Sequence, residues 1–419
     1  MTILADLLST VFERRNRRRT AEPVGEGRSL SEIASDLIGS SSETSGLALA
    51  DEILARFGSM NDDGKLEFFR YLANAMNIDP ESVRTTLEEY ERNPTRTSYR
   101  AFAEASEPAR QELIRRLNRV PGATGNLVNM RSDLLRLGKG EPELEALDLD
   151  FRHLFSSWFN RGFLVLRPIS WESPAHILEK IIAYEAVHAI DSWEDLRRRL
   201  EPVDRRCFAF FHPAMPDEPL IFVEVALNQG VPGSVQKLLA EDRTAMEAEQ
   251  ADTAVFYSIS NCQSGLASIS FGNSLIKQVA SDLSAELPNL ETFVTLSPIP
   301  GLTKWLEQDN LNFDIDQPED MKALAAHFLL KAKSQNGMPL DPVARFHLGN
   351  GAKVHAVHAE ADVSEKGQAQ SGGTMVNYLY DLNEVAANHE RFATSQMVVA
   401  SGEVEALADT AKLTNEVRG

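Results

Sequence analysis

Two residues in the second half of the chain have side chains suited to acid–base or nucleophilic chemistry. Ser297 follows the apolar segment TFVTL and precedes Pro298 and Pro300, whose rings restrict the backbone and would hold the hydroxyl at a strand end. His347 follows an apolar stretch and precedes a turn that contains two glycines. Histidine is the side chain whose ordinary pKa lies nearest neutrality. Each residue also has a purely structural explanation, as a strand terminator and as a buried histidine.

Two further histidines, His355 and His358, raise the question of a metal site. They lie in the segment AKVHAV and just after it, which has the composition of a strand. Residues three apart on a strand point to opposite faces, so these two rings would not bind one ion together. The sequence therefore predicts no metal site.

A third candidate is a glycine-bearing loop between a predicted strand and a predicted helix. The strand AVFYSIS runs into the loop NCQSGLASISFGN, and the helix SLIKQVASDL follows. Free amide groups and the positive end of a helix dipole bind phosphate, so the loop predicts a pyrophosphate site, although its glycines would equally serve a tight turn. The candidate binding residues are Gln263, Ser264, Gly265, Leu266, Ala267, Ser268, Gly272 and Asn273.

The elements that would position these residues fall into two regions. Apolar residues recur at helical spacing up to about residue 158, and short β-rich runs separated by helical stretches follow. At 419 residues, two domains are expected, so we predict a helical bundle over 1–160 and a mixed α/β domain over 161–419. The segment SPAHILEKIIAYEAV is predicted to be helical, and the β-rich runs are GFLVLRPI, CFAFFH, PLIFVEVAL, AVFYSIS and TFVTLS.

Composition excludes several classes of function. The net charge of −20 argues against binding duplex nucleic acid, and no apolar run approaches the roughly 18 residues of a membrane span. Cys207 and Cys262 form no CxxC pair, which favours a reducing compartment and, with no cleavable leader apparent, a cytoplasmic protein. An arginine-rich stretch near the N-terminus fits a solvated helix end or a targeting or nucleic-acid arm; its members are Arg14, Arg15, Arg17, Arg18 and Arg19.

Several ordered blocks between residues 157 and about 382 resemble the malonyl-CoA decarboxylase family. The blocks are SWFNRGFLVLRPISWESP, EPLIFVEVAL, FYSISNCQSGLASISFGNSLIKQV, LPNLETFVTLSPIPGLTKWL, DPVARFHLGNGA and ADVSEKGQAQSGGTMVNYLYDL. The common motifs of nicotinamide, ATP and zinc-protease sites, GxGxxG, GxxxxGK[ST] and HExxH, are absent. The number of blocks and their order make chance similarity improbable.

The resemblance implies a helical domain followed by a catalytic domain similar to the GNAT acetyltransferase fold. It also implies a homo-oligomer, a dimer or tetramer through the helical domain, without metal or organic cofactor. The implied enzyme is a carboxy-lyase that converts malonyl-CoA to acetyl-CoA and carbon dioxide. Its catalytic serine, histidine and tyrosine fall on Ser297 of SPIPG, His347 of FHLGNGA and Tyr380 of NYLY. In the same fold the loop from Gln263 to Asn273 would meet the phosphates of coenzyme A.

Four positions depart from the family pattern. The family often has an acidic residue at Ser270, an arginine at Leu379, and an Arg-x-Asn pattern at Ala356 and His358. These departures leave the serine, histidine and tyrosine in place and affect secondary contacts.

Other functions remain compatible with these residues. An acyltransferase would transfer the acyl group to an amine, and a malonyl-CoA sensor would bind without turnover. An acyl-enzyme reaction through Ser297 is less favoured because the GxSxG nucleophile motif is absent and decarboxylation needs no covalent intermediate.

Overall fold

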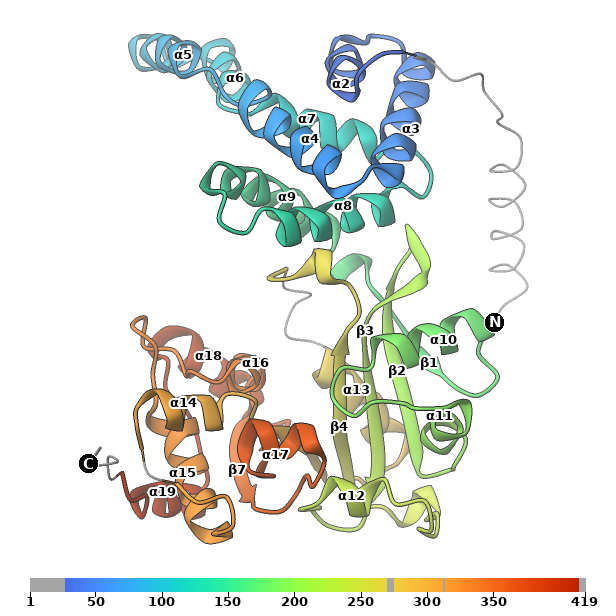
Figure 1. Cartoon of the computed structure of the whole chain (residues 1–419), viewed down its shortest axis with the longest axis vertical. Helices are drawn as coiled ribbons and strands as arrows, with labels where there is room; N and C mark the ends of the chain where they lie inside the picture. Colours follow the sequence, from blue (N-terminus) through green and yellow to red (C-terminus); the bar gives the residue numbers. More distant parts are fainter. Residues whose placement is uncertain (1–26, 270–274, 312, 414–419) are drawn as a thin grey trace. The chain divides into compact units, whose positions relative to one another are not determined.

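The computed structural model describes residues 27–269, 275–311 and 313–413, which form two compact units. The described part of the first unit comprises 27–163, 212–216 and 263–269, and the second comprises the remaining described residues. Figure 1 shows the helices of the first unit and the sheet of the second. The arginine-rich stretch lies outside the described residues.

The first unit is helical, as the apolar periodicity predicts. Its packing centres on aromatic side chains, for example Phe57, whose ring lies 5.9 Å from Phe68 and 5.4 Å from Phe69. Some of the helices begin at a polar residue that caps them: Asp79 accepts hydrogen bonds from two amides of α5, and Pro80 occupies its first turn. The helices are α2 (Leu30–Gly39), α3 (Glu43–Ser59), α4 (Asp62–Ala75), α5 (Pro80–Arg92), α6 (Arg96–Ala105), α7 (Ala109–Leu117), α8 (Ala123–Leu137) and α9 (Glu145–Trp158), with short 3-10 helices η1 (Pro142–Leu144), η2 (Arg161–Phe163) and η4 (Ser264–Leu266).

The second unit is built on a mixed sheet in the order β1-β2-β3-β4-β5-β8-β6, with β7 also paired to β8. The predicted helical bundle followed by a mixed α/β domain is therefore confirmed as the fold class. The strands are β1 (Val165–Ile169), β2 (Arg205–His212), β3 (Met215–Asn228), β4 (Thr253–Asn261), β5 (Thr292–Thr295), β6 (Ser297–Pro298), β7 (Lys353–His358) and β8 (Met375–Leu379). The tip of the β2–β3 hairpin, residues 212–216, clusters with the first unit.

Helices cover both faces of this sheet because side chains alternate along each strand. On β2, Cys207 and Ala209 pack with α10 (Ala175–Tyr184) and α11 (Trp193–Leu200), whereas Phe208 and Phe210 join the larger core with α13 (Leu275–Glu286). The remaining helices are α12 (Val235–Leu238), η3 (Ala248–Gln250), α14 (Leu302–Gln308), α15 (Pro318–Lys331), α16 (Pro342–Gly349), α17 (Glu365–Ser371), α18 (Val385–Ser395) and α19 (Gly402–Asp409).

Two elements differ from the sequence prediction. The helix predicted to run through Val187 ends at Tyr184, because the carboxylate of Glu185 accepts hydrogen bonds from the amides of Val187 and His188. The strand predicted through Ser297 is divided at Leu296, and its second part pairs with β8.

Strands β4 and β5 pair in parallel only as far as Phe256 and Thr295. The amide of Leu296 still donates to the carbonyl of Phe256, at 3.0 Å, and beyond this point the chain turns away to form β6. Strand β4 continues to Asn261. The two strands therefore separate after the pair Phe256 and Thr295, just before Ser297.

Glu224 lies on β3 of this sheet, and its carboxyl group is fully buried. It accepts a hydrogen bond from Arg199 Nη1 at 3.3 Å, and its other oxygen has no hydrogen-bond partner among the described residues. Burial, together with the nearby carboxylate of Glu185, raises the pKa of Glu224 from an ordinary 4.5 to about 8. Between these values the unfolded chain releases a proton that the folded chain retains, so the free energy of unfolding falls as pH rises through this window.

We therefore expect Glu224→Gln to become more stable relative to the parent protein as pH increases from 5 to 8.5, by on the order of 2 kcal/mol or more. Thermal unfolding at both pH values measures the difference. Glu307→Gln, at an exposed position of α14, is the control and should show no such trend. A Glu224→Gln difference that is constant across pH would contradict the raised pKa.

Candidate active site

Ser297, His347 and Tyr380, the three predicted catalytic residues, meet in the second unit. Ser297 Oγ lies 3.2 Å from His347 Nε2, and His347 Nδ1 lies 2.8 Å from the Tyr380 hydroxyl. All three side chains are buried, with at most 5% exposed. Both imidazole nitrogens are therefore occupied, one by the serine and the other by the tyrosine.

Three different elements supply these side chains. Ser297 lies on β6, His347 lies near the C-terminal end of α16, and Tyr380 follows β8. The amide of Tyr380 donates to the carbonyl of Phe293 on β5, at 2.8 Å, which fixes the end of β8 beside β5. Asp341 caps α16 by accepting from the amide of Ala344 at 2.7 Å, so the helix that carries the histidine begins at a defined residue.

Two residues that the sequence analysis did not select complete the cluster. Thr295 Oγ1 accepts a hydrogen bond from Ser297 Oγ at 2.8 Å and another from the amide of Tyr378 at 3.1 Å. The Tyr378 ring stacks on the His347 ring, with centroids 4.5 Å apart. Thr295 and Tyr378 each lie two positions before a predicted catalytic residue, and this spacing along strands is the signal that could have identified them.

Burial controls the protonation of the cluster. It lowers the pKa of His347 to about 3 and raises the pKa of Tyr380 well above its ordinary value. The imidazole is therefore neutral at physiological pH and offers one N–H donor and one acceptor. If the Tyr380 hydroxyl donates to Nδ1, then Nε2 carries the proton and donates to Ser297, whose own proton is directed to Thr295.

A cavity of about 220 Å³ opens onto the serine and histidine. It lies where β4 and β5 separate, since residues of β4 line one side and Ser297 and Pro298 of β6 line another. Apolar side chains dominate the rest of the wall. The lining residues are Val187, Phe256, Tyr257, Ile259, Asn261, Ser297, Pro298, Pro342, Val343, Phe346 and His347.

The predicted phosphate loop lies partly in the first unit and partly outside the described residues. Arg131 of α8 donates to the carbonyls of Gly265 and Ala267, at 2.7 and 2.9 Å. A Cβ at Gly265 would lie 1.8 Å from the carbonyl oxygen of Val128, so glycine is required by the close approach of η4 to α8. Ser264 contacts Ser132 of the same helix at 2.6 Å. Gly272, Asn273 and Ser270 are not among the described residues.

Three positions that depart from the family pattern lie on β7 and β8. The side chain of His358 hydrogen-bonds through Nε2 to that of Asn377, and Asn377 Nδ2 donates to the carbonyl of Thr295 at 2.7 Å. His358 is thereby linked to the residue that contacts Ser297. Ala356 pairs with Asn377 and Leu379 with Val294 across the sheet. No cluster of three or more potential metal ligands occurs among the described residues.

The fold and this cluster define a two-unit α + α/β protein with a buried serine–histidine–tyrosine site. A family model described as the malonyl-CoA decarboxylase C-terminal domain matches residues 162–318 and 315–417, and one described as the N-terminal domain matches 76–159. The mitochondrial malonyl-CoA decarboxylase of Anser anser anser is 34% identical over 71% of this chain and 69% of that protein.

Solved structures of bacterial relatives agree with the sequence matches. The malonyl-CoA decarboxylase of Rhodopseudomonas palustris is 46% identical with a TM-score of 0.85, covering 90% of this chain and 98% of that one. The corresponding protein of Agrobacterium vitis is 44% identical with a TM-score of 0.86, covering 91% and 100%. The chain belongs to the malonyl-CoA decarboxylase family.

Proposed function

We propose that this chain is a carboxy-lyase that converts malonyl-CoA to acetyl-CoA and carbon dioxide, with Ser297, His347 and Tyr380 as its catalytic residues. The observation that carries the proposal is the continuous contact from Tyr380 through His347 to Ser297 at the wall of the cavity. Family membership supports the reaction and the substrate.

Decarboxylation has two steps that these residues would assist. Loss of carbon dioxide breaks a C–C bond and leaves an enolate of the acetyl thioester, which must then take a proton at carbon. Ser297 would orient the departing carboxylate by donating a hydrogen bond in place of its contact with Thr295. The apolar wall would disfavour the charged carboxylate relative to neutral carbon dioxide.

The neutral imidazole restricts how the proton can travel. With a pKa of about 3, His347 is not protonated to imidazolium at neutral pH and so has no second proton to donate. It would instead pass Nε2–H to the serine oxygen as Ser297 gives its own proton to the enolate carbon, and the solvent proton that balances the reaction would enter at Nδ1 through the Tyr380 hydroxyl. This relay places Ser297 nearest to the substrate and the histidine behind it.

The experiment that tests the reaction supplies pure protein with malonyl-CoA alone, in D₂O, without amine acceptor, ATP or added metal. The expected products are equal amounts of carbon dioxide and singly deuterated acetyl-CoA. Turnover that begins only when an amine is added would indicate an acyltransferase. Release of malonate would indicate hydrolysis, and tight binding without turnover would indicate a sensor.

Tyr380→Phe tests the tyrosine as a positioning group. Removing its hydroxyl leaves His347 Nδ1 without the 2.8 Å partner, so the tautomer that donates to Ser297 is no longer favoured. We expect kcat to fall by about tenfold or more while KM changes little. Steady-state kinetics measure this split, and Tyr99→Phe, at a position that is 58% exposed, is the control. An unchanged kcat would contradict the role.

The remaining expectations extend this proposal. The loop 263–273 would meet the coenzyme A phosphates. The helical unit would form the surface of a homo-oligomer, which light scattering of the purified protein tests.

Cys207 and Cys262 are buried free thiols, in keeping with a reducing, cytoplasmic setting. Among the described residues no helix is long and apolar enough to cross a membrane.

A further inference from the structure

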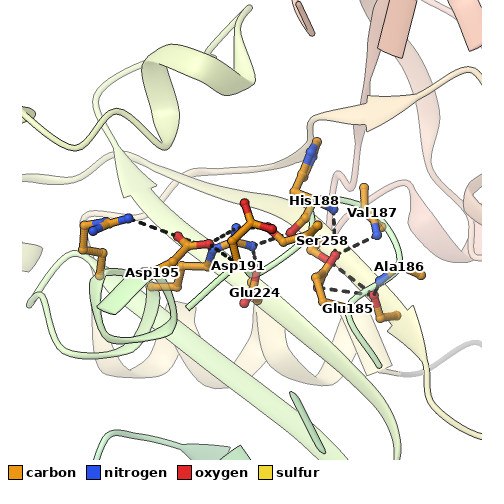
Figure 2. Close-up of polar contacts among 12 residues, drawn as sticks. Glu185, Ala186, Val187, His188, Asp191, Asp195, Glu224 and Ser258 are labelled. Carbon is orange, nitrogen blue, oxygen red and sulfur yellow. Dashed lines mark hydrogen bonds and ion pairs between the residues drawn. The ribbon is translucent and has the colours of Figure 1, made fainter. Parts of the chain in front are cut away.

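Residues 185–189 lie in the connection between α10 and α11 and have no regular secondary structure, and the side chain of Glu185 organises them. The carboxylate accepts from the amides of Val187 and His188, at 2.7 and 2.9 Å, and from Ser258 Oγ on β4, at 2.8 and 2.7 Å to its two oxygens. Figure 2 shows these contacts converging on Glu185. One side chain therefore shapes the turn and attaches it to the sheet.

Three further side chains hold the same backbone. Ser260 on β4 accepts from the amide of Ala186 at 3.2 Å. Arg199 of α11 donates to the carbonyls of His188 and Ala189, at 2.8 and 2.9 Å. Lys366 of α17 donates to the carbonyl of Ala186 at 2.5 Å. These hydrogen bonds hold the backbone on both sides of Val187 and so fix its position.

Val187 lines the cavity together with Ser297 and His347. Other apolar residues of the wall, Ile259, Val343 and Phe346, also pack against the largest core cluster of this unit, and Val187 is not among the described residues of that cluster. A substitution at Val187 therefore disturbs that cluster less than one at Ile259, Val343 or Phe346. The free volume of the cavity beside Ser297 and His347 therefore depends on the size of the Val187 side chain.

We propose that Val187, positioned by the carboxylate of Glu185, limits the size of the substituent on the acyl carbon that loses carbon dioxide. The inference rests on the proposed function. An unsubstituted malonyl thioester fits against this wall, and a 2-alkylmalonyl thioester places its alkyl group where Val187 stands. Methylmalonyl-CoA would follow the same chemistry: its C–C bond breaks, carbon dioxide leaves, and the carbon takes a proton to give propionyl-CoA.

The experiment compares kcat/KM for methylmalonyl-CoA with kcat/KM for malonyl-CoA in the parent protein and in Val187→Ala, Val187→Leu and Glu185→Gln. We expect Val187→Ala to raise this ratio about tenfold or more, as is typical of a change of a methyl group or two in an apolar pocket, and Val187→Leu to lower it. Glu185→Gln replaces an acceptor oxygen with an amide donor facing other donors, so it should raise the ratio while lowering turnover of malonyl-CoA. Val363→Ala, at a position that is 59% exposed, should leave the ratio unchanged.

A ratio that is the same in Val187→Ala, Val187→Leu and the parent protein would overturn the inference while leaving decarboxylation intact. If the parent protein does not decarboxylate malonyl-CoA, the proposed function fails instead. The affinity for propionyl-CoA relative to acetyl-CoA, measured by calorimetry, then tests the size limit without turnover. A higher relative affinity in Val187→Ala would support the inference, and an unchanged relative affinity would overturn it.

Discussion

His347→Ala should reduce kcat for malonyl-CoA decarboxylation by about 10² to 10⁴, the range typical of a lost acid–base group. The ring contacts Ser297 through Nε2 and Tyr380 through Nδ1, so its removal interrupts the proton route at its centre. Carbon dioxide and acetyl-CoA should decline together. Initial rates at saturating malonyl-CoA measure the effect.

The alanine variant also removes a ring that stacks on Tyr378, so a loss of folding must be separated from a loss of chemistry. His347→Gln fills more of the space and supplies an amide, and thermal unfolding of both variants reports their stability. His153→Ala, at an exposed position of α9, is the matched control. Near-normal kcat in a folded His347→Gln and His347→Ala would contradict the assignment.

A second consequence concerns pH. Because burial lowers the pKa of His347 to about 3, the kcat profile should show no ionisation of this histidine between about pH 5 and pH 9. A group that titrates within that range must therefore be sought elsewhere in the enzyme or in the substrate.

Local pattern predicted most of the fold because helices and strands here obey simple periodicity. The prediction failed where hydrogen bonds from a side chain or contacts with a distant segment determine the backbone conformation. The end of α10 at Tyr184 depends on hydrogen bonds from the carboxylate of Glu185, and helix propensity contains no term for them. The clustering of 263–269 with the helical unit depends on contacts with α8, more than 130 positions earlier in the chain, such as that from Arg131 to Gly265.

Only some residues of the candidate site could be predicted from the sequence. Residue types alone singled out Ser297 and His347, but their pairing across 50 positions came from the order of the family blocks, since no local spacing implies it. Thr295 and Tyr378 were missed because a threonine within an apolar strand and a second tyrosine are usually structural, and only the three-dimensional contacts distinguish them. Val187 could not have been found, because its place at the cavity depends on a turn that the sequence pattern predicted as helix.

Ser297→Ala should lower kcat by about 10² to 10³, which corresponds to about 3 to 4 kcal/mol of lost transition-state stabilisation for one donor. The serine lines the cavity beside His347, and its own proton is directed to Thr295 Oγ1 at 2.8 Å. If it orients the departing carboxylate, its loss should weaken binding of malonyl-CoA more than binding of acetyl-CoA, which has no carboxylate. Calorimetry with both thioesters measures this difference.

The same variant distinguishes orientation from covalent catalysis. An acyl-enzyme through Ser297 would leave a malonyl or acetyl adduct on the parent protein, visible by intact-mass spectrometry of a quenched reaction and absent in Ser297→Ala. We expect no adduct in either protein, because a decarboxylation that proceeds through an enolate keeps the acyl group on sulfur throughout. Ser395→Ala, at an exposed position of α18, controls for the substitution and should retain full activity. An adduct on the parent protein would replace the orienting role of Ser297 with a nucleophilic one, and His347 would then act as its general base.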